Sequence, residues 1–594
     1  EYDKTTGLPT CERINGREIT RKWDELTGRP VSESVEGNTL HFGYNLSGSL
    51  NHFQLNEHSP LAFRHDALGR ETVRESANGF ILASRYTATG LLAHQSAGQA
   101  TPFFRETLAQ NDPHFPPQAS AVNRSWQYDR AHNVRVIDDS RWGQTRYRYN
   151  TNDQILHTLF EGTRPHEEQF SYDANGNLNQ HLPSDVQGAV EQITQRQKAG
   201  RVVQQGDSHY RYDDNGCLVE KIEQRDGFRP QIWRYRWDTQ NQLTHVETPD
   251  GSRWHYRYDA FGRRVRKLKV HDGKLTAANL QLWLAGKPDL APRSGAIMGQ
   301  EYLWSGDQLI EEVPVYADGT PVEGQRVRWL YEPGALTPSA RFEKGKLHYI
   351  VSDHQGTLRE MLSEEGMLVW AQRLTTWGKA EKSQVIASNN PDYHVNCNLR
   401  FCGQYEDEES GLYYNFHRYY SPETAQYISA DPIGLLGGFN PYSYVSNPSN
   451  FIDPFGLSKT SSVKNTGGRQ VLDPDSAAGW EKAEKYYDKI RTDPTDISTI
   501  AKNTGWKEPH IARIKEHVFF KEHKLDNGMG RFDADPGIVN SWERLKKGDF
   551  VKSDIELLRH EYFESRFEGI FSTNYRTAHD AAEKTGRIWK YWLD

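Results

Sequence analysis

Apolar and polar residues alternate along the first three quarters of the chain. An aromatic residue followed by Asp or Asn, with Gly or Asn two to four residues later, recurs there, as in "FSYDANGNL" and "YRYDDNGCL". Several neighbouring copies start 21 residues apart, at positions 2, 23, 44 and 65 and again at 128 and 149. Alternation predicts strands, and Asn, Asp and Gly accept the turn geometry that closes a hairpin. The pattern therefore predicts hairpins stacked into a long continuous sheet. A propeller is the alternative, but its blades need about 40 to 50 residues each.

Helical periodicity replaces this alternation after residue 457, beyond a polar stretch, "SKTSSVKNTGGRQ". The segment "DISTIAKNTGWKEPHIARIKEHVFF" predicts two helices separated by a turn at Gly505. Such a pair could place one helix in a nucleic-acid groove or only pack a small core. The apolar faces comprise Ile497, Ile500 and Ala501 on the first helix, and Ile511, Ile514 and Val518 on the second.

Composition sets the class of protein. The 594 residues are 36% hydrophobic and 12% aromatic, which is enough to build large packed cores and too aromatic for a disordered chain. No stretch has the 18 or more apolar residues typical of a membrane-spanning helix. The net charge of −8 argues against nucleic-acid binding by the whole chain, and residues 458–594 are nearly neutral with 24 basic and 23 acidic residues. Four cysteines provide neither a disulfide framework nor a CxxC metal motif, which favours synthesis in a reducing compartment.

Two sequence features resemble one known family. The Tyr-Asp repeats are similar to those of Rhs and YD-repeat proteins, and "LRFCGQYEDEESGLYYNFHRYYSPETAQYISADPIGLLGGFNPYSYVSNPSNFIDPFGL" resembles the Rhs core-associated segment. The resemblance covers about residues 1–457, and it implies a mainly β fold, a hollow cocoon of YD-repeat hairpins. It implies three domains: a YD-repeat shell at 1–396, an autoproteolytic plug at 397–457 and a small α-rich (α or α+β) toxin domain at 458–594. The sequence shows no PAAR-like or transmembrane segment of the kind that precedes many Rhs cores.

An Asp-Pro-x-Gly-Leu pentad occurs twice, beginning at Asp431 and at Asp453. Turn formation alone accounts for its Pro and Gly, because Pro restricts φ and Gly accepts positive φ. Two carboxylates brought together can instead share a proton and act as base and acid on a peptide bond. The resemblance to Rhs proteins implies the second role: Asp431 and Asp453 form an aspartyl-protease dyad that cuts between Leu457 and Ser458. Arg418 is a candidate supporting cation, although an Arg in a Tyr-rich strand can equally be a stacking residue.

Histidine and glutamate residues are unusually dense in the predicted toxin domain. The helix "SDIELLRHEYFESRFEGIF" places His and Glu one turn apart, and further His residues lie on neighbouring predicted elements. His and Glu on successive turns can ligate a divalent metal or act as general acid and base, whereas a single such pair is most often a surface ion pair. "HEYFE" lacks the second His of the zincin motif, which disfavours a zinc protease. The candidate residues are His517, His523, His560, Glu561, Glu564 and His579.

These features lead to a functional hypothesis with stated alternatives. We expect a secreted interbacterial toxin, made in the bacterial cytoplasm and delivered into target cells, whose shell holds a cleaved toxin with nuclease activity. An ADP-ribosyltransferase, a protease or a membrane-disrupting toxin are alternatives, as is a structural shell whose pentads are not catalytic. The core needs no cofactor, and the toxin could use a divalent metal. The resemblance implies a cognate immunity protein and a secretion spike or adaptor as partners, with nucleic acid as a candidate partner of the toxin.

Overall fold

A computed structural model of residues 1–594 divides into two compact units, residues 1–467 and 468–594. Each unit is considered by itself. The structure describes the chain except for residues 4–7, 15, 47, 111–115, 174–175, 184–189, 193–194, 271–296, 382–383, 386–394, 439, 458–459, 462–476, 526–527, 549, 551, 572–576, 578, 580 and 583–594.

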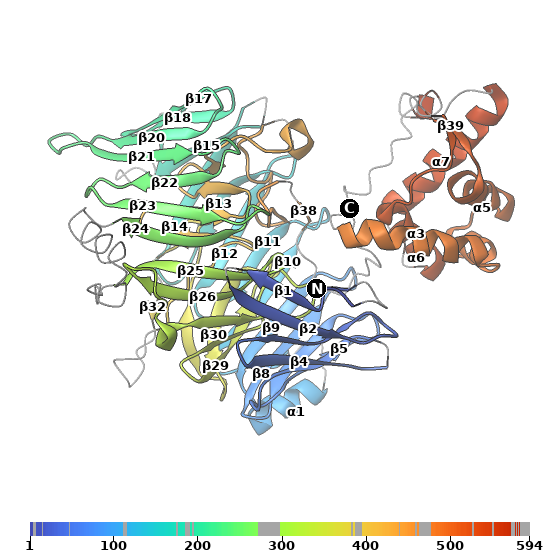
Figure 1. Cartoon of the computed structure of the whole chain (residues 1–594), viewed down its shortest axis with the longest axis horizontal. Coiled ribbons are helices and arrows are strands. Elements are labelled where there is room, and N and C mark those ends of the chain that lie inside the picture. Colours follow the sequence, from blue (N-terminus) through green and yellow to red (C-terminus); the bar gives the residue numbers. More distant parts are fainter. Residues whose placement is uncertain are drawn as a thin grey trace, which may run out of the picture. The chain divides into compact units, whose positions relative to one another are not determined.

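Two 16-stranded sheets make up most of the first unit, and every strand pairs antiparallel with its neighbour in sequence (Figure 1). The first sheet contains β1 (Cys11–Ile14), β2 (Arg17–Trp23), β3 (Pro30–Val35), β4 (Asn38–Tyr44), β5 (Leu50–Leu55), β6 (Leu61–His65), β7 (Glu71–Ser76), β8 (Phe80–Tyr86), β9 (Leu92–Gln99), β10 (Val122–Tyr128), β11 (Val134–Asp139), β12 (Gly143–Tyr149), β13 (Ile155–Phe160), β14 (His166–Tyr172), β15 (Leu178–Pro183) and β16 (Val190–Gln192), with helix α1 (Pro102–Gln110) between β9 and β10.

The second sheet repeats this arrangement. It contains β17 (Gln195–Lys198), β18 (Arg201–Gln205), β19 (Ser208–Tyr212), β20 (Leu218–Glu223), β21 (Gln231–Trp237), β22 (Leu243–Glu247), β23 (Arg253–Tyr258), β24 (Arg264–Val270), β25 (Ile297–Ser305), β26 (Gln308–Tyr316), β27 (Val327–Leu330), β28 (Ala340–Glu343), β29 (Lys346–Ser352), β30 (Leu358–Ser363), β31 (Leu368–Ala371) and β32 (Gln384–Val385), with a 3-10 turn at Glu323–Gln325. Strictly sequential pairing is what a chain of short hairpins produces, so the predicted stack of hairpins is confirmed.

The Tyr-Asp repeat has a direct physical role in these hairpins. At one copy, the Asp259 carboxylate accepts hydrogen bonds from the backbone N–H groups of Phe261 and Arg263, at 2.9 and 3.0 Å, and so closes the turn. Gly262 supplies the positive φ of +79° that the turn requires. The Tyr258 hydroxyl donates to the carbonyl of Leu243 at 2.7 Å and ties the hairpin to the preceding one. The same hydroxyl-to-carbonyl bond is made by Tyr44, Tyr86, Tyr128, Tyr149, Tyr172 and Tyr212.

The two sheets pack against each other through apolar side chains. Phe80 of β8 and Tyr349 of β29 are both fully buried, and their ring centroids are 4.6 Å apart. Leu55 and Phe63 of the first sheet belong to the same buried cluster as Leu347 of the second. Removing these aromatic and aliphatic faces from water supplies the main stabilisation of the unit.

Residues 397–457 pack against both large sheets, and their buried side chains share a core with the second sheet. They form a four-stranded sheet and several turns: β33 (Tyr405–Asp407), β34 (Leu412–Asn415), β35 (Arg418–Ser421), β36 (Gln426–Tyr427), a 3-10 turn at Gly434–Gly437 and β37 (Phe451–Ile452), which pairs with β38 (Thr460–Ser461). Asn447 donates to the Asp153 carbonyl of the first sheet at 2.9 Å. Arg264 of the second sheet forms a buried ion pair with Asp407, to which Lys267 also donates at 3.0 Å.

The second unit is helical. It contains α3 (Ala477–Thr492), α4 (Asp496–Thr504), α5 (Glu508–Lys515), a π-helical turn (Glu516–Phe520), the short hairpin β39 (His523–Leu525) and β40 (Gly528–Gly530), α6 (Pro536–Lys547) and α7 (Lys552–Phe571). The predicted turn at Gly505 is confirmed, with a left-handed φ of 74° that ends α4. The predicted apolar faces of α4 and α5 pack into one core with Tyr487, Trp542 and Leu558.

The fold class expected from the sequence is confirmed: two large antiparallel sheets are followed by a small α-rich unit. Within the described part of the chain, none of the helices combines the length and apolarity that crossing a membrane requires.

Candidate functional sites

The two repeated pentads meet at Arg418. Its Nη2 atom lies 2.9 Å from Asp431 Oδ2 and 3.4 Å from Asp453 Oδ2, and all three side chains are nearly or fully buried. The guanidinium also lies 3.7 Å from the centroid of the Tyr427 ring. Arg418 therefore both stacks on a tyrosine and bridges the two carboxylates, so the two roles considered for it occur together.

Asp453 is held by groups from three strands. The Tyr427 hydroxyl donates to Asp453 Oδ2 at 2.8 Å, and Asn415 Nδ2 donates to the Asp453 carbonyl at 2.9 Å. Asn415 also donates to the Tyr427 hydroxyl at 2.7 Å, which leaves that hydroxyl proton directed at the carboxylate. These buried contacts restrict the orientation of the Asp453 side chain, as a group acting in catalysis requires.

The peptide that precedes the expected cleavage position lies against this pair. The backbone N–H of Leu457 donates to Asp453 Oδ1 at 3.0 Å, and Arg418 Nε donates to the carbonyl of Gly456. Gly437 marks where the Leu457 carbonyl approaches Asp431: a Cβ at position 437 would lie 2.5 Å from Leu457 O and 2.2 Å from Asp431 Oδ2. Ser458, on the other side of the expected cleavage position, is outside the described residues.

Burial raises the pKa of both aspartates above the ordinary value for Asp. Arg418 acts in the opposite direction on each, and for Asp453 the Tyr427 hydrogen bond also opposes the rise while the Asp431 charge adds to it. A carboxyl with a raised pKa can keep its proton nearer neutral pH and act as an acid. The pair can therefore hold one proton between two carboxylates, as an acid and base pair on one peptide bond must.

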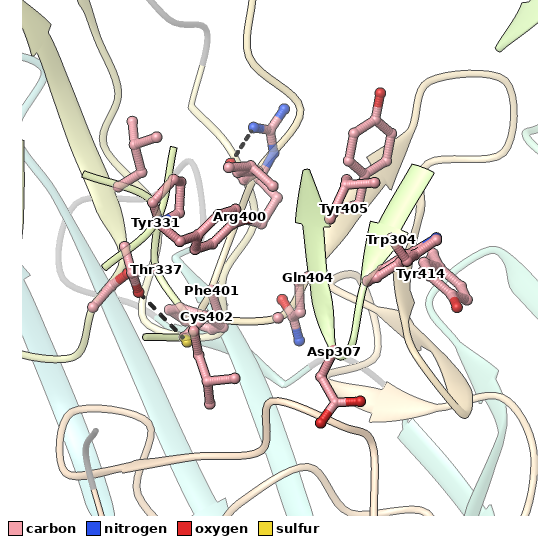
Figure 2. Close-up of a pocket in the computed structure, with 17 residues that line it drawn as sticks. Trp304, Asp307, Tyr331, Thr337, Arg400, Phe401, Cys402, Gln404, Tyr405 and Tyr414 are labelled. Atoms are coloured by element: carbon pink, nitrogen blue, oxygen red, sulfur yellow. Dashed lines mark hydrogen bonds between the residues drawn. The ribbon is translucent and has the colours of Figure 1, made fainter. Parts of the chain in front are cut away.

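A mostly apolar pocket lies between the second sheet and residues 399–405 (Figure 2). Figure 2 shows Trp304, Tyr331 and Thr337 around it, together with Phe401 and Gln404. Gln404 is 1% exposed, and its side-chain amide makes no hydrogen bond with the described residues. Gly403, in the same turn, packs against the backbone of the second pentad, since a Cβ there would lie 2.1 Å from Pro454 O.

The His and Glu residues singled out in the second unit gather in one cluster, in which His579 is partly exposed and the others are buried. His560, Glu561 and Glu564 lie on α7, His517 lies in the π-helical turn after α5, and His523 lies on β39. His579 approaches from beyond α7, with its Nδ1 atom 2.7 Å from Glu564 Oε1. All six candidates therefore come together. A π-helical turn is itself frequent at functional sites.

Glu568 is a member of the cluster that sequence reasoning missed. Its Oε2 atom lies 3.0 Å from His523 Nδ1 and 2.7 Å from Lys521 Nζ. A usable signal was present in the sequence: Glu561, Glu564 and Glu568 are spaced i, i+3 and i+7, which places them on one face of a helix.

The pKa values of Glu561 and Glu564 are shifted in opposite directions. Burial and the neighbouring Glu564 charge raise the pKa of Glu561 to about 8. Burial also acts to raise the pKa of Glu564, but the imidazoles of His517, His560 and His579 outweigh it and hold that pKa well below its usual range. Without a bound cation, one of these neighbouring carboxyls therefore keeps its proton at neutral pH more readily than the other.

Comparison with known proteins adds to this picture. Residues 122–278 match a family model described as the teneurin YD-shell, and residues 347–384 match one described as RHS protein. The chain is 35% identical over 467 residues to "Probable deoxyribonuclease RhsA" of Dickeya dadantii (strain 3937), covering 77% of this chain and 28% of that protein. It is 34% identical over 553 residues to "Probable deoxyribonuclease RhsB" of the same strain, covering 90% of this chain and 33% of that protein.

The chain belongs to the Rhs/YD-repeat family. A solved structure of TcdB2-TccC3 without its hypervariable C-terminal region has a similar fold, with a TM-score of 0.51 and 17% sequence identity over 74% of this chain and 21% of that chain. This Rhs chain spans about a third of the length of the curated relatives RhsA and RhsB.

Proposed function

We propose that this Rhs chain cuts itself after Leu457 and so separates its C-terminal unit from its β sheets. The observation that carries the proposal is that Arg418 joins Asp431, Asp453 and the Gly456 carbonyl in one buried site. Turn formation explains the Pro and Gly of both pentads. It does not explain why two carboxylates 22 residues apart in the sequence contact the same guanidinium group.

The contacts suggest separate roles for the two aspartates. Asp431 lies on the side of the Leu457 carbonyl oxygen and, when protonated, acts as the acid that donates to it. Ionised Asp453 acts as the base that takes a proton from the attacking water. Water adds to the Leu457 carbonyl carbon, the bond to the Ser458 nitrogen then breaks, and that nitrogen receives a proton to leave as an amine. The products are a carboxylate at Leu457 and a new amino terminus at Ser458.

Asp453→Asn tests this proposal because it keeps the size of the side chain and removes the base. On a denaturing gel the wild type should appear as fragments of 457 and 137 residues, whereas the variant should remain one chain of 594 residues. Exposed Asp214, replaced by Asn, is the matched control and should cleave like the wild type. One full-length band from both the wild type and Asp453→Asn would rule out self-cleavage.

The second candidate function is a deoxyribonuclease in the released unit. Residues 1–457 make up 77% of the chain, so the match to RhsB, which covers 90%, must include part of residues 458–594. RhsA and RhsB are both named as probable deoxyribonucleases. The buried cluster around Glu564 offers the His and carboxylate groups that hydrolysis of a phosphodiester requires.

Supercoiled DNA, RNA and NAD offered to the chain, with and without a chelator, separate the alternatives. We expect nicking or linearisation of DNA by the wild type, loss of that activity in His560→Ala, and unchanged RNA and NAD. Cleaved NAD with intact DNA would favour an ADP-ribosyltransferase instead. If DNA, RNA and NAD all stay intact, the protease and membrane-disrupting alternatives become the ones to test.

Delivery and protection follow from the same proposal. A toxin of this kind would be made in the cytoplasm of the producing bacterium, loaded onto a secretion spike or adaptor and carried into a target cell. A cognate immunity protein would bind the released unit in the producer. The named toxin relatives support this context, including "Toxin protein Tse5" of Pseudomonas aeruginosa, which is 29% identical over 396 residues.

A further inference from the structure

The side chains around Glu564 divide into two groups of ligand atoms that face different oxygens of the same carboxylate. Oε1 of Glu564 lies 2.7 Å from His560 Nε2 and 2.7 Å from His579 Nδ1. Oε2 lies 3.7 Å from His517 Nε2, which is also 3.7 Å from a carboxylate oxygen of Glu561. In each group the ligand atoms all lie within 4.8 Å of one another, close enough to surround one ion. The atoms of the first group are at present hydrogen-bonded to one another.

The second group contains polar atoms with no hydrogen bonds. His517 is 1% exposed and Glu564 is fully buried, yet both ring nitrogens of His517 and Oε2 of Glu564 lack a hydrogen-bond partner among the described residues. A buried, unsatisfied polar atom is costly, commonly by about 1–3 kcal/mol. Separations of 3.7 Å are too long for hydrogen bonds, but ligands bound to one ion at about 2.0–2.2 Å normally lie somewhat over 3 Å apart.

We propose that this cluster is a dinuclear metal centre in which the Glu564 carboxylate bridges two divalent ions. The first ion is held by Glu564 Oε1, His560 Nε2 and His579 Nδ1. The second is held by Glu564 Oε2, His517 Nε2 and the Glu561 carboxylate. This inference deepens the proposed nuclease function and rests on it for the reaction, but not for the binding of the ions.

The remaining pair, His523 and Glu568, supports the centre from outside. His523 Nε2 lies 2.8 Å from the carbonyl oxygen of His517, to which it donates, and this bond fixes the position of the His517 backbone. Lys521 Nζ already neutralises Glu568 at 2.7 Å, which disfavours a third ion there. Glu568 Oε2 lies on the side of His517 Nδ1, at 3.9 Å, which is beyond hydrogen-bonding distance but close to where a metal-bound histidine needs an acceptor for its second nitrogen.

The donor atoms indicate the kind of metal. Three imidazoles and two carboxylates form a mixed nitrogen and oxygen set, which suits first-row ions such as Zn²⁺ or Mn²⁺ better than Mg²⁺ or Ca²⁺, whose sites are built from oxygen. Two ions about 3.5–4 Å apart can stabilise both the attacking and the leaving oxygen of a phosphodiester. The centre therefore matches the chemistry of the proposed substrate.

Metal counting on the full chain tests the centre separately from its activity. After chelator treatment and reconstitution with Mn²⁺, elemental analysis should find two ions per chain, and electron paramagnetic resonance should show the signal of a coupled pair. Glu564→Gln should bind at most one ion and lose the coupled signal. Glu561→Gln and His579→Ala should each bind one. Glu508→Gln, an exposed carboxylate on α5, is the control and should bind two.

The outcomes distinguish this inference from the nuclease proposal. No more than one ion in the wild type, or a coupled pair that survives in Glu564→Gln, overturns the dinuclear centre even if DNA is cut. Two coupled ions with intact DNA keep the centre and refute the deoxyribonuclease. Circular dichroism checks that each variant is folded. If a variant does not fold, the number of ions per wild-type chain and the coupled resonance signal of the wild type test the dinuclear centre by themselves.

Discussion

Replacing Gly437 with Ala should slow self-cleavage strongly without unfolding the chain. The backbone at Gly437 has no positive φ, so alanine is conformationally acceptable there. The added Cβ would nevertheless lie 2.2 Å from Asp431 Oδ2 and 2.5 Å from Leu457 O. One methyl group would therefore be inserted between the proposed acid and the carbonyl that it serves.

The size of the effect follows from these distances. Non-bonded heavy atoms prefer separations of about 3.5–4.0 Å, so the carboxylate and the carbonyl must each move by about 1 Å. A misplacement of about 1 Å between reacting groups can cost about 100-fold in rate. That factor corresponds to about 2.7 kcal/mol of activation free energy. We expect Gly437→Ala to accumulate the fragments of 457 and 137 residues about 100 times more slowly than the wild type.

The assay is the time course of fragment appearance in a cell-free translation, followed on denaturing gels. Gly324→Ala is a control in which the new Cβ meets nothing within 4 Å. Gly434→Ala is a second control: it strains the same turn, at a φ of +60°, but its Cβ also meets nothing within 4 Å. Cleavage of Gly437→Ala at the wild-type rate would refute the placement of the Leu457 carbonyl beside Asp431.

Two further variants test the chemistry and the packing of the plug. Tyr427→Phe removes a hydrogen bond that lowers the pKa of Asp453, so that pKa rises and the acidic limb of the cleavage rate should move to higher pH. Tyr128→Phe, which loses only a strand contact, should leave the profile unchanged. Asp407→Ala leaves Arg264 buried without its carboxylate and Lys267 with Glu409 alone. It should lower the free energy of unfolding by about 3–5 kcal/mol in urea titrations, whereas Asp214→Ala should change it by less than about 0.5 kcal/mol. The two cations hold the pKa of Asp407 below its ordinary value against the effect of burial. Its contribution to stability is therefore complete above the unfolded pKa of about 3.9 and declines as the pH falls below it, so the urea midpoint should fall more between pH 6 and pH 3 in the wild type than in Asp407→Ala.

Much of this fold could be predicted from the sequence because short-range contacts determine it. Asp259 of the repeat closes its own turn within four residues, and the Tyr hydroxyls named above bond to carbonyls 10 to 36 residues earlier in the chain. Because each hairpin needs the same short-range contacts, the residues that make them recur periodically in the sequence. For the same reason the turn at Gly505 and the buried faces of α4 and α5 were predictable.

Only the tertiary structure decided how the candidate residues meet. Arg418 reaches both aspartates, and Gly437 lies between Asp431 and Leu457, through contacts that no periodicity records. His517 meets Glu561 and Glu564 from an element more than 40 residues earlier. The sequence determined which side chains were chemically capable, because residue type and local spacing suffice for that. Their convergence depends on how helices and strands pack over long sequence separations, which is a property of the folded chain as a whole.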